Sequence, residues 1–155
     1  NRDDVKRAAE TVRDRLGDVH ILVNNAGVMY LMPLESYNEE LFDRMINVNV
    51  KGIIYTTLEL LPQLKKTKGV IINIASNAGI GTAFEGTTYY AITKAAVIIL
   101  TKRMAFELGR YGIRVNAVAP GWVETDMTTA NRTLESILRI INTDPSDSPI
   151  IKPCH

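Results

Sequence analysis

The stretch GVIINIA, residues 69–75, is a continuous apolar run rich in β-branched residues. Runs of this kind are typical of a parallel strand that is buried on both faces of its sheet. Two further runs share this character: HILVN at residues 20–24, and IRVNAVA at residues 113–119, which Pro120 and Gly121 end. These three segments predict the strands of one sheet.

Helical patterns lie before and between these runs. Residues 1–17 place apolar side chains on one helical face, with acidic residues in the first turn and Gly17 as the expected C-terminal cap. The apolar face consists of Val5, Ala8, Ala9, Val12 and Leu16.

A second helical region is predicted to begin at Ser36, because Ser36 and Glu39 have the S-x-x-E spacing of a capping box. It runs to about Lys65, with a bend expected near residues 47–52, and a third helix reaches about Gly109. Since helices and strands alternate along the chain, the sequence predicts an α/β fold with a parallel sheet and right-handed crossovers.

The composition excludes several classes of protein. The chain has 155 residues, of which 46% are hydrophobic and 23% are charged, and its net charge is +1. A charge this small gives no electrostatic reason to bind nucleic acid or an anionic membrane. No apolar run approaches the length of a membrane span, and Cys154 has no partner for an internal disulfide, so a cytoplasmic location is expected. His20 has no neighbouring ligand cluster, so no metal site is predicted.

The stretch GTTYYAITKAAVIIL, residues 86–100, combines two adjacent tyrosines with one lysine in an apolar helix. Lys94 lies four residues after Tyr90, so both side chains share one helical face, whereas Tyr89 is rotated from Tyr90 by about 100°. A nearby ammonium lowers the pKa of a tyrosine from its usual value of about 10, which would suit Tyr90 to acid–base catalysis near neutrality. The alternative is a core tyrosine with a lysine that extends to solvent, and the spacing alone favours that alternative.

Five motifs in one order change this balance, because together they resemble the short-chain dehydrogenase/reductase family. They are NNAG at residues 24–27, NVNVKG at 47–52, NIAS at 73–76, YAITK at 90–94 and NAVAPGWVETDM at 116–127. The resemblance covers about residues 1–127 and implies the catalytic half of a Rossmann-like, doubly wound parallel sheet. Residues 128–155, a possible helix followed by an irregular tail, are not matched to the family.

The resemblance implies four catalytic residues. Tyr90 is the general acid/base, Lys94 lowers its pKa and bonds the nicotinamide ribose, and Ser76 hydrogen-bonds the substrate oxygen. Asn49, rather than Asn47, matches the family asparagine that anchors a water in the proton relay to Lys94. Donors at Ser76 and Tyr90 would stabilise negative charge as it develops on a carbonyl oxygen.

The resemblance also implies a cofactor site for NADP or NAD. The turn Asn24, Asn25, Ala26 and Gly27 lines the adenine-ribose side of the cofactor and steadies the sheet. Pro120, Gly121 and Thr125 face the nicotinamide, with Thr125 near its carboxamide. Ligands of open α/β sheets bind at the carboxyl ends of the strands, and Asn24, Ser76 and Pro120 all follow such ends.

The chain departs from the family pattern in two ways. Ser76 and Tyr90 are one residue further apart than is commonest in the family, which would select Tyr89; Tyr90 is preferred because Thr93, four residues after Tyr89, supplies no charge. The extra residue is expected in the loop GIGTAFEGT, residues 79–87.

The second departure is that the glycine-rich pyrophosphate turn, the segment that selects NAD or NADP, and the usual C-terminus are not recognisable. The chain alone is therefore expected to bind the cofactor poorly or not at all, and it is expected either to belong to a longer enzyme or to be a truncated product.

The motif NAVAPGWVETDM is most similar to that of 3-oxoacyl-acyl-carrier-protein reductases, so a small carbonyl or alcohol substrate is expected. A sugar dehydrogenase of the glucose 1-dehydrogenase type, another alcohol dehydrogenase of the family, an NAD-dependent epimerase or dehydratase, and a catalytically inactive scaffold remain alternatives. Residues 95–100 are all apolar and residues 53–61 are rich in apolar side chains, so both helices need partners on more than one face. The resemblance implies a homo-oligomer, commonly a tetramer, built through these helices. The alternative is that segments missing from the chain cover the apolar faces of these helices.

Overall fold

The computed structural model describes residues 1–81 and 85–123. Three parallel strands form one sheet in the order β1-β2-β3, with β1 at Ile21–Asn24, β2 at Val70–Ile74 and β3 at Arg114–Val118. In register, Leu22 lies beside Ile71, and Ile71 beside Val115. All three predicted strands and their parallel pairing are confirmed.

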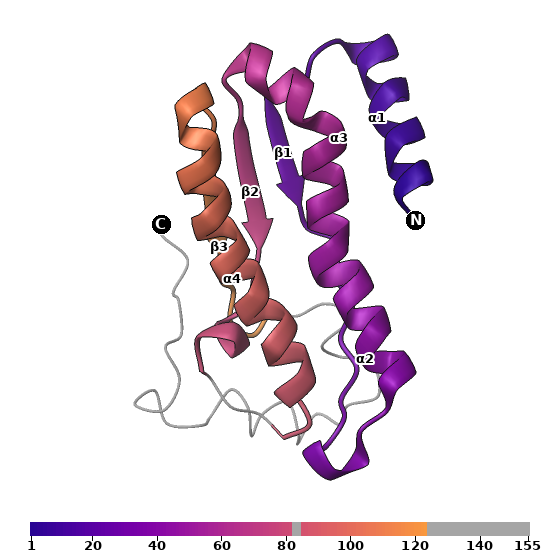
Figure 1. Ribbon diagram of the computed structural model, residues 1–155. Helices are drawn as coiled ribbons and strands as arrows, with labels where there is room; N and C mark the ends of the chain where they lie inside the picture. Colours follow the sequence, from indigo (N-terminus) through magenta and orange to yellow (C-terminus); the bar gives the residue numbers. More distant parts are fainter. Residues whose placement is uncertain (82–84, 124–155) are drawn as a thin grey trace.

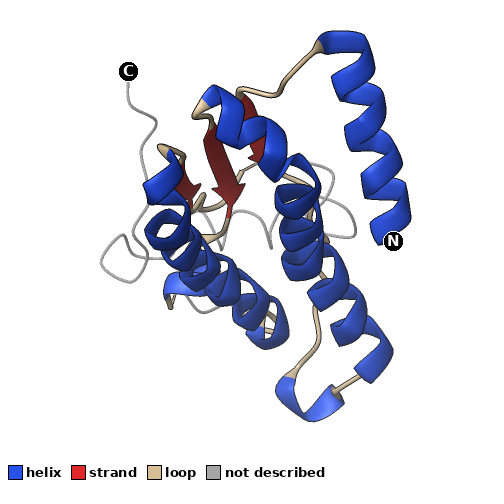
Figure 2. Ribbon diagram, turned by 45° about the horizontal axis from the view of Figure 1, so that its top comes forward, coloured by secondary structure: helices blue, strands red, loops and turns tan. Residues whose placement is uncertain are grey.

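The helices between the strands cover one face of this sheet (Figure 1). They are α3 at Gly52–Thr67, between β1 and β2, and α4 at Thr88–Leu108, between β2 and β3. The turned view in Figure 2 again places both helices on the same side of the strands. The core between these layers contains Leu22, Leu64, Ile71, Ile113 and Val115, each at most 9% exposed.

The opposite face of the sheet is open among the described residues. Ile21, Val23 and Val118 point to it and are 63%, 52% and 48% exposed. Along β2, buried and partly buried residues alternate, although the apolar run predicted burial on both faces. The prediction was wrong because burial on the second face depends on a covering layer that the described segments do not provide.

The first helix, α1 at Arg2–Leu16, begins at the side-chain cap of Asn1 and ends at Gly17, which has a φ of 85°. It packs beside α3, as Figure 1 shows, and not across the sheet. Of its predicted apolar face only Ala9 is buried, while Leu16 is 83% exposed. The helix was therefore predicted correctly, but its neighbour covers less of it than the pattern indicates.

The region after β1 contains short elements before the long helix. A 3-10 turn, η1, spans Leu34–Ser36; α2 spans Glu39–Ile46, and a π-helical turn, η2, spans Asn47–Lys51 before α3. The helix cap is Asn38, whose Oδ1 accepts a hydrogen bond of 3.0 Å from the Leu41 N–H. The predicted start at Ser36 was thus two residues early, since asparagine caps a helix as well as serine does. The predicted bend corresponds to η2.

A buried polar frame joins the strands to the helices that cover them. Asn24 Nδ2 donates to Asn73 Oδ1 at 2.8 Å, and Thr56 Oγ1 of α3 donates to Asn24 Oδ1 at 2.6 Å. Asn73 Nδ2 in turn donates to Thr101 Oγ1 of α4 at 2.9 Å. Because each asparagine finds partners in two elements, burial of these amides is compensated and the layers are held in register.

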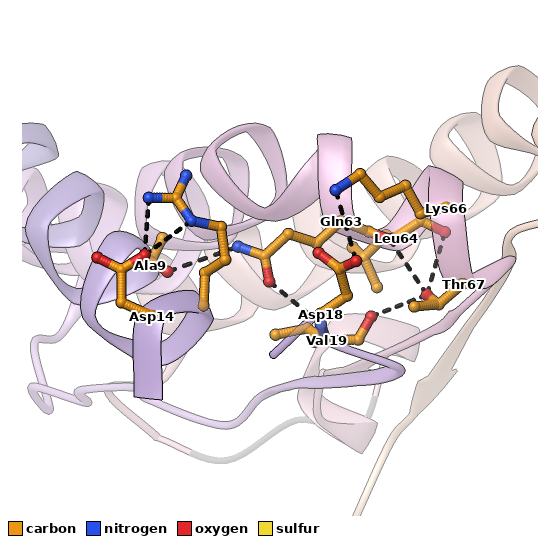
Figure 3. Close-up of polar contacts among 9 residues, drawn as sticks. Ala9, Asp14, Asp18, Val19, Gln63, Leu64, Lys66 and Thr67 are labelled. Atoms are coloured by element: carbon orange, nitrogen blue, oxygen red, sulfur yellow. Dashed lines mark hydrogen bonds and ion pairs between the residues drawn. The ribbon is translucent and has the colours of Figure 1, made fainter. Parts of the chain in front are cut away.

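The amino end of the sheet has its own polar contacts, which Figure 3 shows. Gln63 accepts from the Val19 N–H at 3.1 Å and donates to the Ala9 carbonyl at 3.5 Å, and Thr67 Oγ1 donates to the Val19 carbonyl at 2.8 Å. These bonds fix the chain between α1 and β1 against α3. No described helix is long and apolar enough to span a membrane.

Candidate active site

The candidate site lies at the carboxyl end of the sheet. Backbone pairing continues past the strands there, since the Ala75 N–H donates to the Val118 carbonyl at 2.8 Å and the Asn77 N–H to the Pro120 carbonyl at 3.0 Å. A 3-10 turn, η3 at Asn77–Ile80, follows β2 and leads through the loop to α4. This arrangement brings Ser76, Pro120 and the first turns of α4 to one edge, as expected for a ligand site in an open α/β sheet.

Ser76 is held by the turn that it begins. It is 8% exposed, has an extended backbone, and accepts a hydrogen bond of 3.2 Å from the Ala78 N–H. Gly79 lets this turn press against α4, because a Cβ there would lie 2.6 Å from the Lys94 carbonyl carbon. Ser76 is therefore fixed beside the helix that carries Tyr90 and Lys94.

Tyr90 lies half-buried and faces Ser76. Burial raises the pKa of the Tyr90 phenol above its usual value, and its hydrogen bond with the Ser76 side chain acts in the opposite direction. The net direction is upward, opposite to that expected from Lys94 alone. Desolvation disfavours the charged phenolate, and here it outweighs the stabilisation.

Lys94 is 4% exposed, and its Nζ donates to the Ile74 carbonyl at 2.8 Å. The same Nζ lies 5.7 Å from the centroid of the Tyr90 ring. Burial lowers the pKa of this ammonium from 10.5 to about 8, because desolvation penalises the charged form. The alternative of a lysine that extends to solvent is therefore excluded.

Asn49 is 1% exposed and lies within η2, whereas Asn47 is exposed. The Asn49 side-chain amide binds the loop after β1 through two hydrogen bonds. Its Oδ1 accepts from the Val28 N–H at 2.8 Å, and its Nδ2 donates to the Val28 carbonyl at 2.9 Å. The same Nδ2 donates to Thr93 Oγ1 of α4 at 3.0 Å. The structure thus places Asn49, and not Asn47, against the helix of Tyr90.

The turn after β1 passes close to this cluster. A Cβ at Gly27 would lie 3.4 Å from Asn49 Oδ1 and 3.5 Å from Lys94 Nζ. Asn25 and Ala26 are exposed, while the Asn24 side chain is buried in the frame between the strands. Of this turn, Gly27 is the part that approaches Lys94, and Asn25 and Ala26 remain accessible.

The segment after β3 supplies the other wall. Pro120 accepts the Asn77 N–H, and a Cβ at Gly121 would lie 3.4 Å from Asn77 Nδ2. Both residues are thus tied to η3, next to Ser76. Thr125, Glu124 and Asp126 lie outside the described residues, as do the tail at 128–155 and part of the loop expected to hold the extra residue.

Tyr89 has a different environment from its neighbour. It is 9% exposed, its hydroxyl donates to the Leu34 carbonyl at 2.7 Å, and its ring contacts those of Tyr37 and Phe42. Its polar atom is thus used to hold the η1 segment, and its ring belongs to an apolar cluster. The preference for Tyr90 over Tyr89 agrees with this geometry.

Two residues of the site were missed by sequence reasoning. Thr93 was considered only as a residue without charge, yet its buried hydroxyl links Asn49 to α4. Gly79 sets the close approach of η3 to the helix. Thr93 could have been found from the sequence, because it is a small polar residue between Tyr90 and Lys94 in an otherwise apolar helix. Gly79 could not, because the close approach of its backbone to α4 follows no periodic pattern in the sequence.

Other features of the described residues do not extend the site. A cavity of about 820 Å³ is lined by seven residues and includes none of the four candidate catalytic residues. Its lining consists of Tyr37, Asn38, Glu39, Glu40, Asp43, Arg44 and Asn47. Within residues 1–81 and 85–123, no three or more His, Cys, Asp or Glu side chains are grouped so as to hold a metal ion.

The chain is similar in sequence to proteins of a known family. A family model described as "short chain dehydrogenase" matches residues 1–136. A 3-oxoacyl-[acyl-carrier-protein] reductase of Thermotoga maritima is 44% identical over 129 residues, which cover 83% of this chain and 52% of that protein. Oxidoreductase UcpA of Salmonella typhimurium is 41% identical over 145 residues, covering 93% of this chain and 53% of that protein.

A solved structure supports the same relationship. A gluconate 5-dehydrogenase of Burkholderia cenocepacia, in complex with NADP and tartrate, superimposes with a TM-score of 0.79 at 34% identity. The match covers 84% of this chain and 51% of that one. The chain thus spans about half the length of the curated relatives that it matches.

Proposed function

We propose, from the premise that this chain belongs to the short-chain dehydrogenase family, that the full-length protein transfers hydride between a nicotinamide cofactor and a carbonyl or alcohol group. The observation that carries this proposal is the cluster at the carboxyl end of the sheet. There the Tyr90 phenol faces the Ser76 hydroxyl, and the buried Lys94 ammonium lies 5.7 Å from the centroid of the Tyr90 ring.

The residues present fit a nicotinamide nucleotide. A lysine ammonium has three N–H donors, and within the described residues one of those of Lys94 binds the Ile74 carbonyl. Further donor capacity therefore remains beside Gly27 and Tyr90, where ribose hydroxyls can accept. Lys94 and Tyr90 would hold the ribose, Pro120 and Gly121 would face the nicotinamide ring, and Asn25, Ala26 and Gly27 would line the adenine side. The cofactor, when bound, supplies or accepts the hydride.

Tyr90 is the group that moves the proton. In carbonyl reduction its hydroxyl donates a proton to the substrate oxygen, and in alcohol oxidation its phenolate accepts one. Ser76 donates a hydrogen bond to the same oxygen, where negative charge develops. A charged Lys94 favours the phenolate that Tyr90 becomes after proton donation, which counters part of the effect of burial on the Tyr90 pKa. Tyr90 must then regain a proton, and the family resemblance implies that Asn49 would anchor the water that relays it through Lys94.

The substrate that we propose is a 3-oxoacyl thioester. Two observations support it: the sequence NAVAPGWVETDM at residues 116–127, and 44% identity to a 3-oxoacyl-[acyl-carrier-protein] reductase. A second candidate is a hydroxyl group of a sugar acid or polyol, because the structure of a gluconate 5-dehydrogenase superimposes closely. NADP and NAD both remain candidates for the cofactor, with NADP present in that related structure.

A direct assay separates these candidates. The full-length protein is incubated with NADPH or NADH and acetoacetyl thioester, and in parallel with NADP or NAD and gluconate, while absorbance of the reduced cofactor is followed. We expect thioester-dependent oxidation of the reduced cofactor. Turnover with gluconate alone would favour the second candidate, and no turnover with any carbonyl or alcohol tested would favour the inactive scaffold.

We further propose that the protein is a homo-oligomer built through α3 and α4. On α4, Ile92, Ile99 and Phe106 are 48%, 60% and 77% exposed, and their spacing of seven residues places them along one side of the helix. On α3, Leu58 is 46% exposed. Exposed apolar stripes of this kind are typical of contacts between subunits, and a tetramer is the form that the family resemblance favours.

Light scattering of the full-length protein at micromolar concentration tests the assembly. We expect a tetramer, and the variant Ile99→Glu should dissociate it because each copy would bury an unpaired carboxylate at the contact. The variant Val12→Glu on α1 serves as a control, since Val12 is exposed on a different helix. A fully active monomer would contradict the proposed assembly without affecting the proposed chemistry.

A further inference from the structure

Thr93 lies between Tyr90 and Lys94 on α4 and is completely buried, with 0% exposure. Its hydroxyl accepts a hydrogen bond from Asn49 Nδ2 at 3.0 Å and donates one to the Tyr90 carbonyl oxygen at 2.8 Å. A hydroxyl can donate and accept at once, so both bonds form together. Thr93 therefore joins the π-helical turn η2 to the backbone of Tyr90.

Asn49 extends this connection to the loop after β1. Its Oδ1 and Nδ2 bind the N–H and the carbonyl of Val28, so both of its polar atoms are engaged. A continuous series of hydrogen bonds thus runs from Val28 through Asn49 and Thr93 to Tyr90. Its members come from three segments that are distant in sequence, and within α4 it ends at the residue that carries the phenol.

The same helix contains a second threonine with matching bonds. Thr101 is 5% exposed, accepts from Asn73 Nδ2 at 2.9 Å and donates to the Val97 carbonyl at 2.7 Å. Its helical partner, Val97, packs in an apolar cluster with Ile53 and Ala75. The two threonines are therefore both buried and make the same type of bonds, but one is joined to Tyr90 and the other to the core.

We propose that Thr93 is a positioning residue for the proton donor Tyr90. Its hydroxyl fixes the first turn of α4 against Asn49, and so sets the place of the Tyr90 phenol relative to Ser76. This inference rests on the proposed function, in which the distance between these two hydroxyls and the substrate oxygen governs the rate. Without the hydroxyl, one N–H of Asn49 loses its acceptor and the turn is free to shift.

The test uses matched variants in the full-length protein. Thr93→Val and Thr101→Val each remove one buried hydroxyl at almost constant volume, and Thr93→Ser and Thr101→Ser restore it. We expect Thr93→Val to lower kcat by about 10- to 100-fold, since small displacements in an active site have effects of this size. The KM for the cofactor should change little, and Thr93→Ser should recover most of the rate.

Thr101→Val is expected to lower the melting temperature by an amount similar to Thr93→Val, and to leave kcat unchanged. Equal losses of kcat for the two valine variants would overturn the proposal, as would a failure of Thr93→Ser to recover activity. If Thr93→Val does not fold, Thr93→Ala compared with Thr93→Ser isolates the same hydroxyl in a smaller side chain.

A second readout does not depend on turnover. In protein labelled with ¹³C at tyrosine Cζ, the Tyr90 resonance is assigned by its loss in Tyr90→Phe, and its titration reports the pKa of the phenol. We expect this pKa to move in Thr93→Val and to stay unchanged in Thr101→Val. An unmoved pKa and an unmoved kcat would refute the positioning role, whereas full activity in Tyr90→Phe would instead refute the proposed function.

Discussion

The two ends of the sheet bury polar side chains in different ways. At the amino end, Gln63 and Thr67 bind backbone groups of residues 9 and 19, as Figure 3 shows, and no described charged group is fully buried there. At the carboxyl end, the ammonium of Lys94 is 4% exposed and Tyr90 is half-buried beside it. The amino end holds the chain in place. The carboxyl end contains Tyr90 and Lys94, whose pKa values are shifted by burial.

We therefore expect the amino end of the sheet to contribute to stability and the carboxyl end to contribute to catalysis. Buried neutral amides and hydroxyls are stable once their hydrogen bonds are made, so they suit a structural role. A buried ammonium has a desolvation cost, which the hydrogen bond from Lys94 to the Ile74 carbonyl offsets only in part, and such groups are frequent at functional sites. Changes at the carboxyl end should therefore affect turnover and pH dependence, and changes at the amino end should affect unfolding alone.

The largest expected effect is at Tyr90. Tyr90→Phe in the full-length protein should lower kcat by about 10² to 10⁴, because loss of general acid catalysis alone has effects of this size. Steady-state kinetics and circular dichroism, measured together, should show an inactive but folded protein. The control is Tyr89→Phe, which removes a hydroxyl bound to the Leu34 carbonyl and should change kcat little. A Tyr90→Phe variant within a few-fold of the parent would contradict the assignment.

The next effect concerns the amino end. Leu64 is fully buried in the core between α3 and the sheet. Leu64→Ala should lower the free energy of unfolding by about 2 to 5 kcal/mol, since it removes buried methyl groups and leaves a cavity. Urea unfolding measures this loss, and kcat per folded molecule should remain that of the parent. A selective loss of kcat would show that the two ends are coupled.

The ionisation of Lys94 should make stability depend on pH. Its pKa is about 8 in the folded protein and 10.5 when unperturbed, so between these values the unfolded chain holds a proton that the folded chain has lost. Stability attributable to Lys94 therefore rises as pH increases from 8 to 10.5 and is constant below pH 8.

Lys94→Met should remove this rise. Lys94→Met should be more stable than the parent. The difference in unfolding free energy between the two should be greatest below pH 8, at most about 3 kcal/mol, and should decrease towards pH 10.5. Thermal unfolding across this range provides the measurement. A parallel shift of the two curves at every pH would mean that Lys94 is not desolvated in solution.

The smallest effect is expected at an exposed ion pair of the amino end. Lys66 Nζ lies 3.5 Å from Asp18 Oδ2, and the lysine side chain is 67% exposed. Lys66→Ala should change the free energy of unfolding by less than about 0.5 kcal/mol, because solvent screens exposed pairs. Urea unfolding in low and high salt checks this. A loss as large as that of Leu64→Ala would assign the stability of this end to charge rather than to buried groups.

Local sequence patterns predicted the elements of this molecule well. The three strands, the alternation with helices, and the shared face of Tyr90 and Lys94 all depend on neighbouring residues, and all are found in the structure. The helix start at Ser36 was wrong because Asn38 offers an equally good cap nearer to the helix. Exposure of Leu16 and Val23, and the raised pKa of Tyr90, depend on what packs against each residue, which no local pattern contains.

The π-helical turn at Asn47–Lys51 has a consequence for how this helix tolerates change in length. A π-helical turn in an α-helix accommodates one more residue than a regular turn, and such turns are frequent at functional sites. Deletion of Val50 or Lys51 would restore a regular helix and rotate the preceding residues, Asn49 included, by about 100° relative to α3. Asn49 would then face away from Val28 and Thr93, although the helix itself would be more regular. Selection should therefore preserve the length of this turn more strictly than the identity of its exposed residues.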